Sequence, residues 1–94
     1  MSLEEYVEHM MITEARVYHI AEALIQGGLT PQEFITCYFV MLGHNTDSIR
    51  ALKGGVTRQT VLYQRQRGLE KIQVHLDQYY AQEGYRLLDW WRVA

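Results

Sequence analysis

Residues 54–72 read GGVTRQTVLYQRQRGLEKI, and this stretch combines a glycine turn, a helix start and a cluster of positive charge. Gly54 and Gly55 interrupt the preceding segment, because glycine readily adopts turn conformations that other residues avoid. Thr57 then supplies a good helix N-cap. Apolar residues recur at helical or heptad steps from Val61 onward. The stretch therefore predicts a turn followed by a long helix, starting at about residue 58 and reaching residue 79 or 80.

The positive charge of the chain is concentrated in this stretch, although the 94-residue chain as a whole has a formal net charge of −2. Residues 1–49 contain seven acidic residues and one basic residue, Arg16. Residues 50–72 contain six basic residues and one acidic residue, Glu70. A basic helix in an acidic protein indicates a local surface for a negatively charged partner.

Three further helices are expected before this one. Residues 3–26 show amphipathic spacing of apolar residues, which predicts a helix that ends at the glycine pair 27–28. Thr30, Pro31 and Glu33 form a capping-box pattern, so a second helix is expected from there to residue 42. It is apolar on nearly every side, which favours a central core position. A short third helix is predicted over residues 46–53, capped by Asn45 or Thr46.

The fold class expected from these elements is all-α: one small helical domain over residues 1–94, with a helix-turn-helix unit at about 46–72 and a long fourth helix. The second half of that fourth helix is expected to extend past the core of the domain. Residues 73–94 are expected to close the core or to mediate dimerisation. The segment 83–94 fits a strand or a short helix about equally well.

A short helix, a glycine turn and a basic helix are the layout of a helix-turn-helix DNA-binding unit. Taking about 100° per residue, Val61, Leu62, Leu69, Ile72 and Leu76 define the expected buried stripe of the long helix. Glutamine can contact adenine through two hydrogen bonds and arginine can contact guanine in the same way, so polar residues off this stripe are candidates for base contacts. The predicted base-contacting residues are Arg58, Gln59, Thr60, Tyr63, Gln66 and Arg67. The predicted phosphate-contacting residues are Thr46, Arg50, Lys53, Thr57, Arg65 and Lys71.

The motifs LTPQEF, VTRQTV and RGLEKI resemble the DNA-binding domains of LuxR-type regulators and of sigma-factor region 4 over about residues 29–72. The resemblance implies that Thr57 caps the recognition helix and that Val61 anchors it. It also implies that Arg58, Gln59 and Thr60 face DNA. GVTRQTV and a later EGY are similar to TrfB-like plasmid repressors, which regulate plasmid transfer and maintenance genes. The segment KGG makes the turn one residue longer than the pattern of the first two families.

Aromatic residues gather near the C-terminus, where they fit either the domain core or a homodimer interface. A base-stacking surface is disfavoured because Arg86 and Arg92 are the only basic residues in that segment. The residues predicted for a dimer interface are Leu76, Tyr79, Tyr80, Trp90 and Trp91.

No residue pattern predicts an enzyme, a cofactor or a metal. The four histidines are scattered, and no Cys/His pair has the spacing of a metal site. Cys37, the single cysteine, is expected to be a buried small hydrophobe, which excludes a disulfide framework and favours a cytoplasmic protein. No stretch is long and apolar enough to predict a membrane span.

The sequence therefore predicts a transcriptional regulator, of bacterial, phage or plasmid origin, that binds double-stranded DNA as a homodimer. RNA polymerase or another regulator is a further conceivable partner. The competing interpretation is a helical protein-interaction module, an adaptor or anti-activator that binds another regulator. An RNA-binding helical domain is a third interpretation.

Overall fold

A computed structural model of the chain describes residues 16–85, and every element in this range is helical. Residues 16–26 form a helix, called the 16–26 helix below. It is followed by α2 (Pro31–Met41), α3 (Thr46–Lys53), α4 (Arg58–Tyr79) and a short 3-10 helix, η1 (Ala81–Glu83). The expected all-α fold class is thus confirmed. The expected first helix starts at residue 3, and its first part lies outside the described residues.

The helix starts follow the local signals in the sequence. The Thr30 hydroxyl accepts a hydrogen bond from the Glu33 N–H (3.2 Å), and the Glu33 carboxylate accepts one from the Thr30 N–H (2.9 Å), which completes the capping box of α2. Asn45 caps α3 through the N–H of Ser48 (2.8 Å). Thr57 caps α4 through the N–H of Thr60 (3.1 Å). Each cap satisfies a backbone donor that the first helical turn leaves without a partner.

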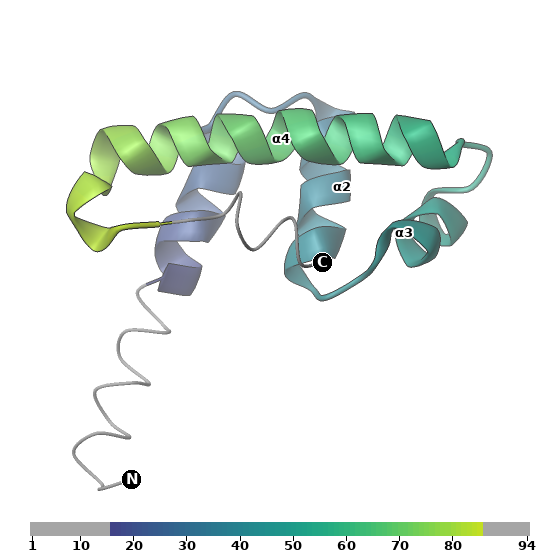
Figure 1. Cartoon of the computed structure of the whole chain (residues 1–94), viewed down its shortest axis with the longest axis horizontal. Helices are drawn as coiled ribbons and strands as arrows, with labels where there is room; N and C mark the ends of the chain where they lie inside the picture. Colours follow the sequence, from purple (N-terminus) through teal and green to yellow (C-terminus); the bar gives the residue numbers. More distant parts are fainter. Residues whose placement is uncertain (1–15, 86–94) are drawn as a thin grey trace, which may run out of the picture.

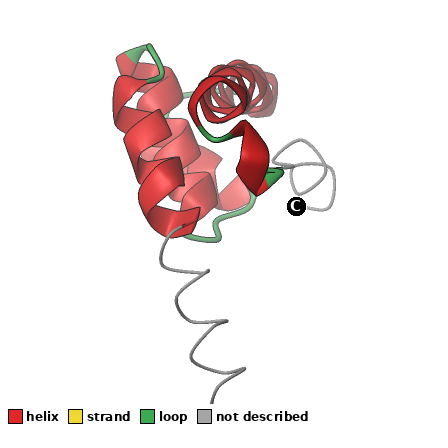
Figure 2. Ribbon diagram, turned by 90° about the vertical axis from the view of Figure 1, so that its left-hand side faces the viewer, coloured by secondary structure: helices red, strands yellow, loops and turns green. Residues whose placement is uncertain are grey.

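The helix α4 spans the described domain, and the other helices pack along it (Figure 1). The 16–26 helix and α2 descend side by side from α4, and α3 lies beneath the N-terminal end of α4. Figure 2 looks nearly along α4 and shows the other helices gathered beside and below it. Because the 16–26 helix covers the second half of α4, the expectation that this half extends past the core is wrong.

Two clusters of buried apolar side chains hold the helices together. The larger one joins the 16–26 helix, α2 and the second half of α4 through Ala23, Leu24, Cys37, Leu69, Ile72 and Leu76. The smaller one joins α2, α3 and the first half of α4 through Val40, Ile49 and Val61. Six of the nine residues lie on α4 or on its neighbour α2, so these two helices carry the packing between both ends of the domain.

The helix α4 approaches α2 closely at Gly68. A Cβ atom at this position would collide with the Sγ atom of Cys37 and would lie 3.4 Å from the Glu33 carbonyl oxygen. Steric contact with α2 therefore favours glycine at position 68, although glycine lowers helix propensity. Burial raises the pKa of the Cys37 thiol to about 12, and the nearby Glu33 charge adds to this effect. Cys37 is fully buried, as the sequence predicted.

Two expectations about helix faces need correction. Leu62 was expected in the buried stripe of α4, but its side chain is 37% exposed. The buried stripe of α4 instead includes Arg65, which lies four residues after Val61 and is buried. The helix α2 was expected to be buried on nearly every side, but it exposes a face that carries Phe34, Ile35 and Tyr38.

Candidate nucleic-acid interface

The first half of α4 exposes most of the residues predicted to contact bases. Arg58, Gln59, Tyr63, Gln66 and Arg67 are all exposed. Tyr63 is 64% exposed, so its ring and hydroxyl are available to a partner. No acidic residue lies between Gly54 and Leu69 in the sequence. This half of α4 therefore presents donors and positive charge, and the nearest carboxylate on the helix, that of Glu70, contacts Gln66 and Arg67 at its C-terminal edge.

The two threonines of the first turn of α4 are engaged with each other. Thr57 is exposed and Thr60 is half-buried, and their hydroxyl oxygens lie 2.9 Å apart. The Thr57 hydroxyl also accepts the capping hydrogen bond from the Thr60 N–H. Their first role in the structure is thus to fix the start of α4.

Two shallow grooves border this half of α4. One lies between the N-terminal ends of α2 and α4 and is lined by Gln59, Thr60 and Tyr63 from α4. The other lies at the turn between α3 and α4 and is lined by Asp47, Arg50 and Arg58, among others. The second groove brings two exposed arginines from different helices to one place, although Asp47 lies beside them.

Arg65 and Thr46, both predicted to contact phosphate, are buried instead. Arg65 is only 3% exposed and Thr46 is 8% exposed, and an Nη atom of Arg65 donates a hydrogen bond to the Thr46 hydroxyl (3.3 Å). Burial lowers the pKa of the Arg65 guanidinium. The prediction is corrected: both side chains connect α4 to α3 inside the domain, out of reach of a phosphate.

Lys53 and Lys71, also predicted to contact phosphate, make internal contacts. Lys53 donates hydrogen bonds to the Thr36 hydroxyl (3.0 Å) and to the side-chain oxygen of Gln64. Burial lowers the pKa of the Lys53 ammonium. Each lysine is half-buried and holds its helix to α2. A phosphate would have to compete with these contacts.

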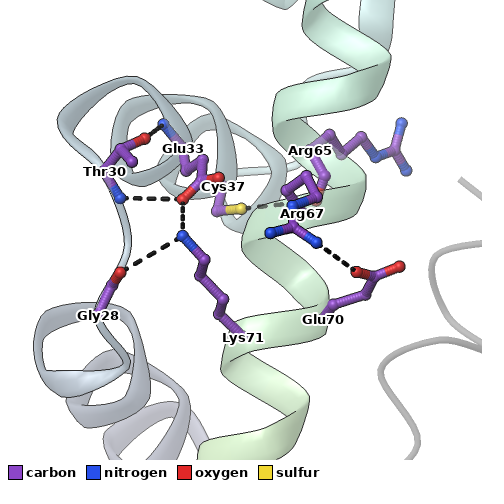
Figure 3. A network of polar contacts seen from close by, with 8 residues as sticks. All are labelled: Gly28, Thr30, Glu33, Cys37, Arg65, Arg67, Glu70 and Lys71. Carbon is purple, nitrogen blue, oxygen red and sulfur yellow. Dashed lines mark hydrogen bonds and ion pairs between the residues drawn. The ribbon is translucent and has the colours of Figure 1, made fainter.

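The contact between Lys71 and Glu33 ties α4 to the capping box of α2 (Figure 3). The Lys71 ammonium lies 2.6 Å from the Glu33 carboxylate and 3.5 Å from the Gly28 carbonyl oxygen. Burial disfavours ionisation of Glu33, but the hydrogen bonds from Lys71 and Thr30 outweigh it and hold the pKa of Glu33 below its ordinary value. Glu33 is 7% exposed, so this ion pair is shielded from solvent.

Three arginines on α3 and α4 remain exposed: Arg50, Arg58 and Arg67. Arg67 forms a loose ion pair with Glu70 (3.8 Å), in which both side chains are well exposed. Such a surface pair stabilises a protein little and can readily rearrange. The surface charge available to a polyanion is therefore smaller than the sequence suggests.

The residues predicted for a dimer interface have different positions. Leu76 is fully buried in the larger core cluster, so its assignment to an interface is corrected. Tyr79 is 61% exposed. Tyr80 is half-buried, and its hydroxyl donates a hydrogen bond to Glu22 (2.7 Å). Trp90 and Trp91 lie outside the described residues.

A cluster of polar and aromatic side chains near Tyr80 was not foreseen from the sequence. The ring of Tyr80 stacks on His19, with ring centroids 3.8 Å apart. A ring nitrogen of His19 lies 2.6 Å from the Tyr85 hydroxyl. These contacts join the 16–26 helix to residues more than sixty positions later, and no local pattern signals such a long-range pairing.

The described residues contain no group of three or more histidine, cysteine, aspartate or glutamate side chains that could hold a metal ion. Within residues 16–85, no helix is long and apolar enough to cross a membrane. Comparison of the chain with protein-family models, curated proteins and solved structures finds no match.

Proposed function

We propose that this protein binds double-stranded DNA through the first half of α4 and acts as a transcriptional regulator in the cytoplasm. The observation that carries the proposal is the exposed set Arg58, Gln59, Tyr63, Gln66 and Arg67 on one capped helix that follows a short helix and a turn. A helix with such a surface suits the major groove, where base edges offer a distinct pattern of donors and acceptors.

The neighbouring helix supports this use of α4. Arg50 on α3 and Arg58 on α4 border the same groove at the turn, which suits contacts to the phosphates that flank a major groove. The caps of α3 and α4 and the buried contact between Arg65 and Thr46 fix the angle between the two helices. A fixed angle is what a helix-turn-helix unit needs to place its second helix.

The structure permits a quantitative expectation for salt dependence. With Arg50, Arg58 and Arg67 as the exposed cations, each protomer neutralises about three phosphates, so log Kobs should fall with log[salt] at a slope of roughly −3 per protomer. Including Lys53, Arg65 and Lys71, which are buried or half-buried, would double that figure. A measured slope therefore separates the structure-based set of contacts from the larger set that the sequence suggested.

The test is a binding titration with DNA fragments obtained by unbiased selection of bound sequences. Arg58→Ala/Arg67→Ala should weaken binding at least about tenfold and reduce the salt slope by about two. Arg16→Ala is the matched control, because Arg16 is exposed on the 16–26 helix, and should leave both quantities nearly unchanged. Failure of the folded wild-type protein to bind any DNA at low salt would refute the proposal. A two-fold symmetric selected site would indicate binding as a homodimer.

Binding to another protein is a second candidate function, favoured by apolar side chains near the basic surface. Leu52 on α3 is 54% exposed, and Leu62 and Tyr63 on α4 are 37% and 64% exposed. Exposed apolar and aromatic side chains are common in protein interfaces. If this apolar surface binds another protein, Leu62→Ala should abolish partner binding. The affinity of the wild type for that partner should then depend only weakly on salt.

A further inference from the structure

Glu70 is the one acidic residue among residues 50–72, and it lies beside two of the residues predicted to contact bases. Its Oε1 atom accepts a hydrogen bond from the side-chain amide of Gln66 (3.3 Å), and its Oε2 atom lies 3.8 Å from an Nη atom of Arg67. Figure 3 shows the Arg67 guanidinium and the Glu70 carboxylate pointing toward one another. A single carboxylate therefore contacts two neighbouring side chains, one through each of its oxygens.

These contacts do little for the stability of α4. An acidic residue that precedes a basic one by one helical turn stabilises a helix more than the reverse order does. In α4 the order is the reverse, because Arg67 precedes Glu70. The two side chains are 50% and 43% exposed, so water screens their attraction. The main effect of Glu70 is therefore expected on what Gln66 and Arg67 bind rather than on folding.

Contacts to bases are compatible with the Glu70 contacts. A glutamine side chain has two N–H donors and one acceptor oxygen, so Gln66 can keep one donor on Glu70 and contact adenine with the other donor and the oxygen. A guanidinium has five N–H donors, so Arg67 can contact Glu70 and still offer two donors to guanine. Because base edges carry no net charge, these contacts bring no second anion to the Glu70 carboxylate.

A contact to phosphate differs, because it brings a second anion to the Arg67 guanidinium. The phosphate and the Glu70 carboxylate would repel one another at this short range. The phosphate has either to displace the carboxylate or to share the guanidinium with it. Since an exposed ion pair contributes little free energy, the expected penalty is about two- to fivefold in affinity per protomer.

We propose that Glu70 is a positioning residue that favours base contacts by Gln66 and Arg67 and opposes contact of Arg67 with phosphate. Non-specific binding depends on phosphate contacts, whereas sequence is read from the base edges. Glu70 therefore raises the ratio between the affinity for the recognised sequence and the affinity for unrelated DNA. This inference rests on the proposed DNA binding and names a residue that sets its specificity.

The test compares Glu70→Gln with the wild type on two duplexes of equal length, one with the sequence obtained by selection and one with its bases scrambled. Glu70→Gln should raise the affinity for the scrambled duplex about two- to fivefold and leave that for the selected duplex nearly unchanged, so the ratio falls. An unchanged ratio would overturn the role of Glu70 and leave the proposed DNA binding intact. Absence of wild-type binding to either duplex would refute the proposed function and this inference together.

Asp77→Asn is the matched control. Asp77 also accepts a hydrogen bond from a glutamine four residues earlier on α4, Gln73 (2.8 Å), but it lies near the opposite end of the helix from the basic half. The substitution removes the same charge from the same helix and should leave the ratio of the two affinities unchanged. An equal fall of the ratio in both variants would show that net charge, rather than the contacts of Glu70, sets the specificity.

A double variant tests whether Glu70 acts through Arg67. In an Arg67→Ala background, Glu70→Gln should change the ratio much less than it does in the wild type, because the guanidinium that the carboxylate contacts is absent. Circular dichroism should show that all variants keep their helix content. The same change of the ratio in both backgrounds would contradict the assigned role of Glu70.

Discussion

At the residue scale, Gly68 shows how spacing between helices constrains a single position. Gly68→Ala should raise helix propensity by up to about 1 kcal/mol. Because the new Cβ would meet Cys37, overpacking is expected to outweigh this gain and lower the free energy of unfolding by about 1–3 kcal/mol. Chemical denaturation measures the change.

The double variant Gly68→Ala/Cys37→Ala provides the control. It removes the Sγ atom that the new methyl group meets, so much of the lost stability should return relative to the sum of the single changes. Additive effects of the two substitutions would show that the contact with Cys37 is not the cause.

Glu33 should make stability depend on acid. Its pKa is lowered in the folded protein relative to the ordinary value of 4.5, so its contribution is complete above that pH and is lost as the pH falls through the lower, folded value. Glu33→Gln should therefore reduce the free energy of unfolding at pH 7 by about 1–3 kcal/mol, because it loses the charged contact with Lys71. The difference between the variant and the wild type should begin to shrink below pH 4.5, where Glu33 becomes protonated in the unfolded chain, and should be lost only below the lower pKa of the folded protein, where Glu33 is neutral in both states.

Glu70→Gln is the matched control for this experiment. Its carboxylate is well exposed and pairs loosely with Arg67, so stability at pH 7 should change little. Unfolding by denaturant at several pH values tests both variants. A constant difference between Glu33→Gln and the wild type from pH 7 to pH 3 would contradict the assigned role.

At the element scale, the helix boundaries were largely predictable because they depend on neighbouring residues. Caps and glycines within a few positions determine where α3 starts and ends, at Thr46 and Lys53. They also determine that α4 starts after Thr57. The side of α4 that is buried was predicted less well. Arg65 lies four residues after Val61 and four before Leu69, which is the spacing of the buried stripe. A charged residue was expected to be exposed, and its partner Thr46 lies on another helix.

The groove between α3 and α4 yields a prediction about charge. Asp47 lies beside Arg50 and Arg58, so its carboxylate would repel a phosphate approaching these arginines. Under the proposed DNA binding, Asp47→Asn should increase DNA affinity several-fold at low salt, with a smaller gain at high salt because screening weakens the repulsion. The substitution Asp77→Asn, on the exposed far end of α4, removes the same charge away from the groove and should have little effect. Equal gains from both variants would point to net charge rather than position.

At the scale of the whole molecule, the two core clusters should differ in stability. The helix α3 contributes one fully buried apolar side chain, Ile49, to the smaller cluster. The second half of α4 contributes three to the larger one. Hydrogen exchange should therefore show lower protection for the amides of α3 than for those around Ile72. Uniform protection across both regions would contradict this.

The variant Ile49→Ala tests the same difference by mutation. It should lower the free energy of unfolding by about 2–5 kcal/mol and increase exchange first in α3. Leu52→Ala on the same helix is the control, because Leu52 is 54% exposed, and its effect should stay within about 0.5 kcal/mol.

The turn between α3 and α4 restricts the chirality of the residue at position 54. Gly54 has φ 67° and ψ 146°, close to the region that only glycine occupies. An L-residue is disfavoured there by the positive φ, and a D-residue is disfavoured because the mirror image of this conformation lies outside the β region of an L-residue. In chemically synthesised protein, both L-alanine and D-alanine at position 54 should lower the thermal midpoint. The turn that joins the two helices thus contains a backbone position that must be achiral.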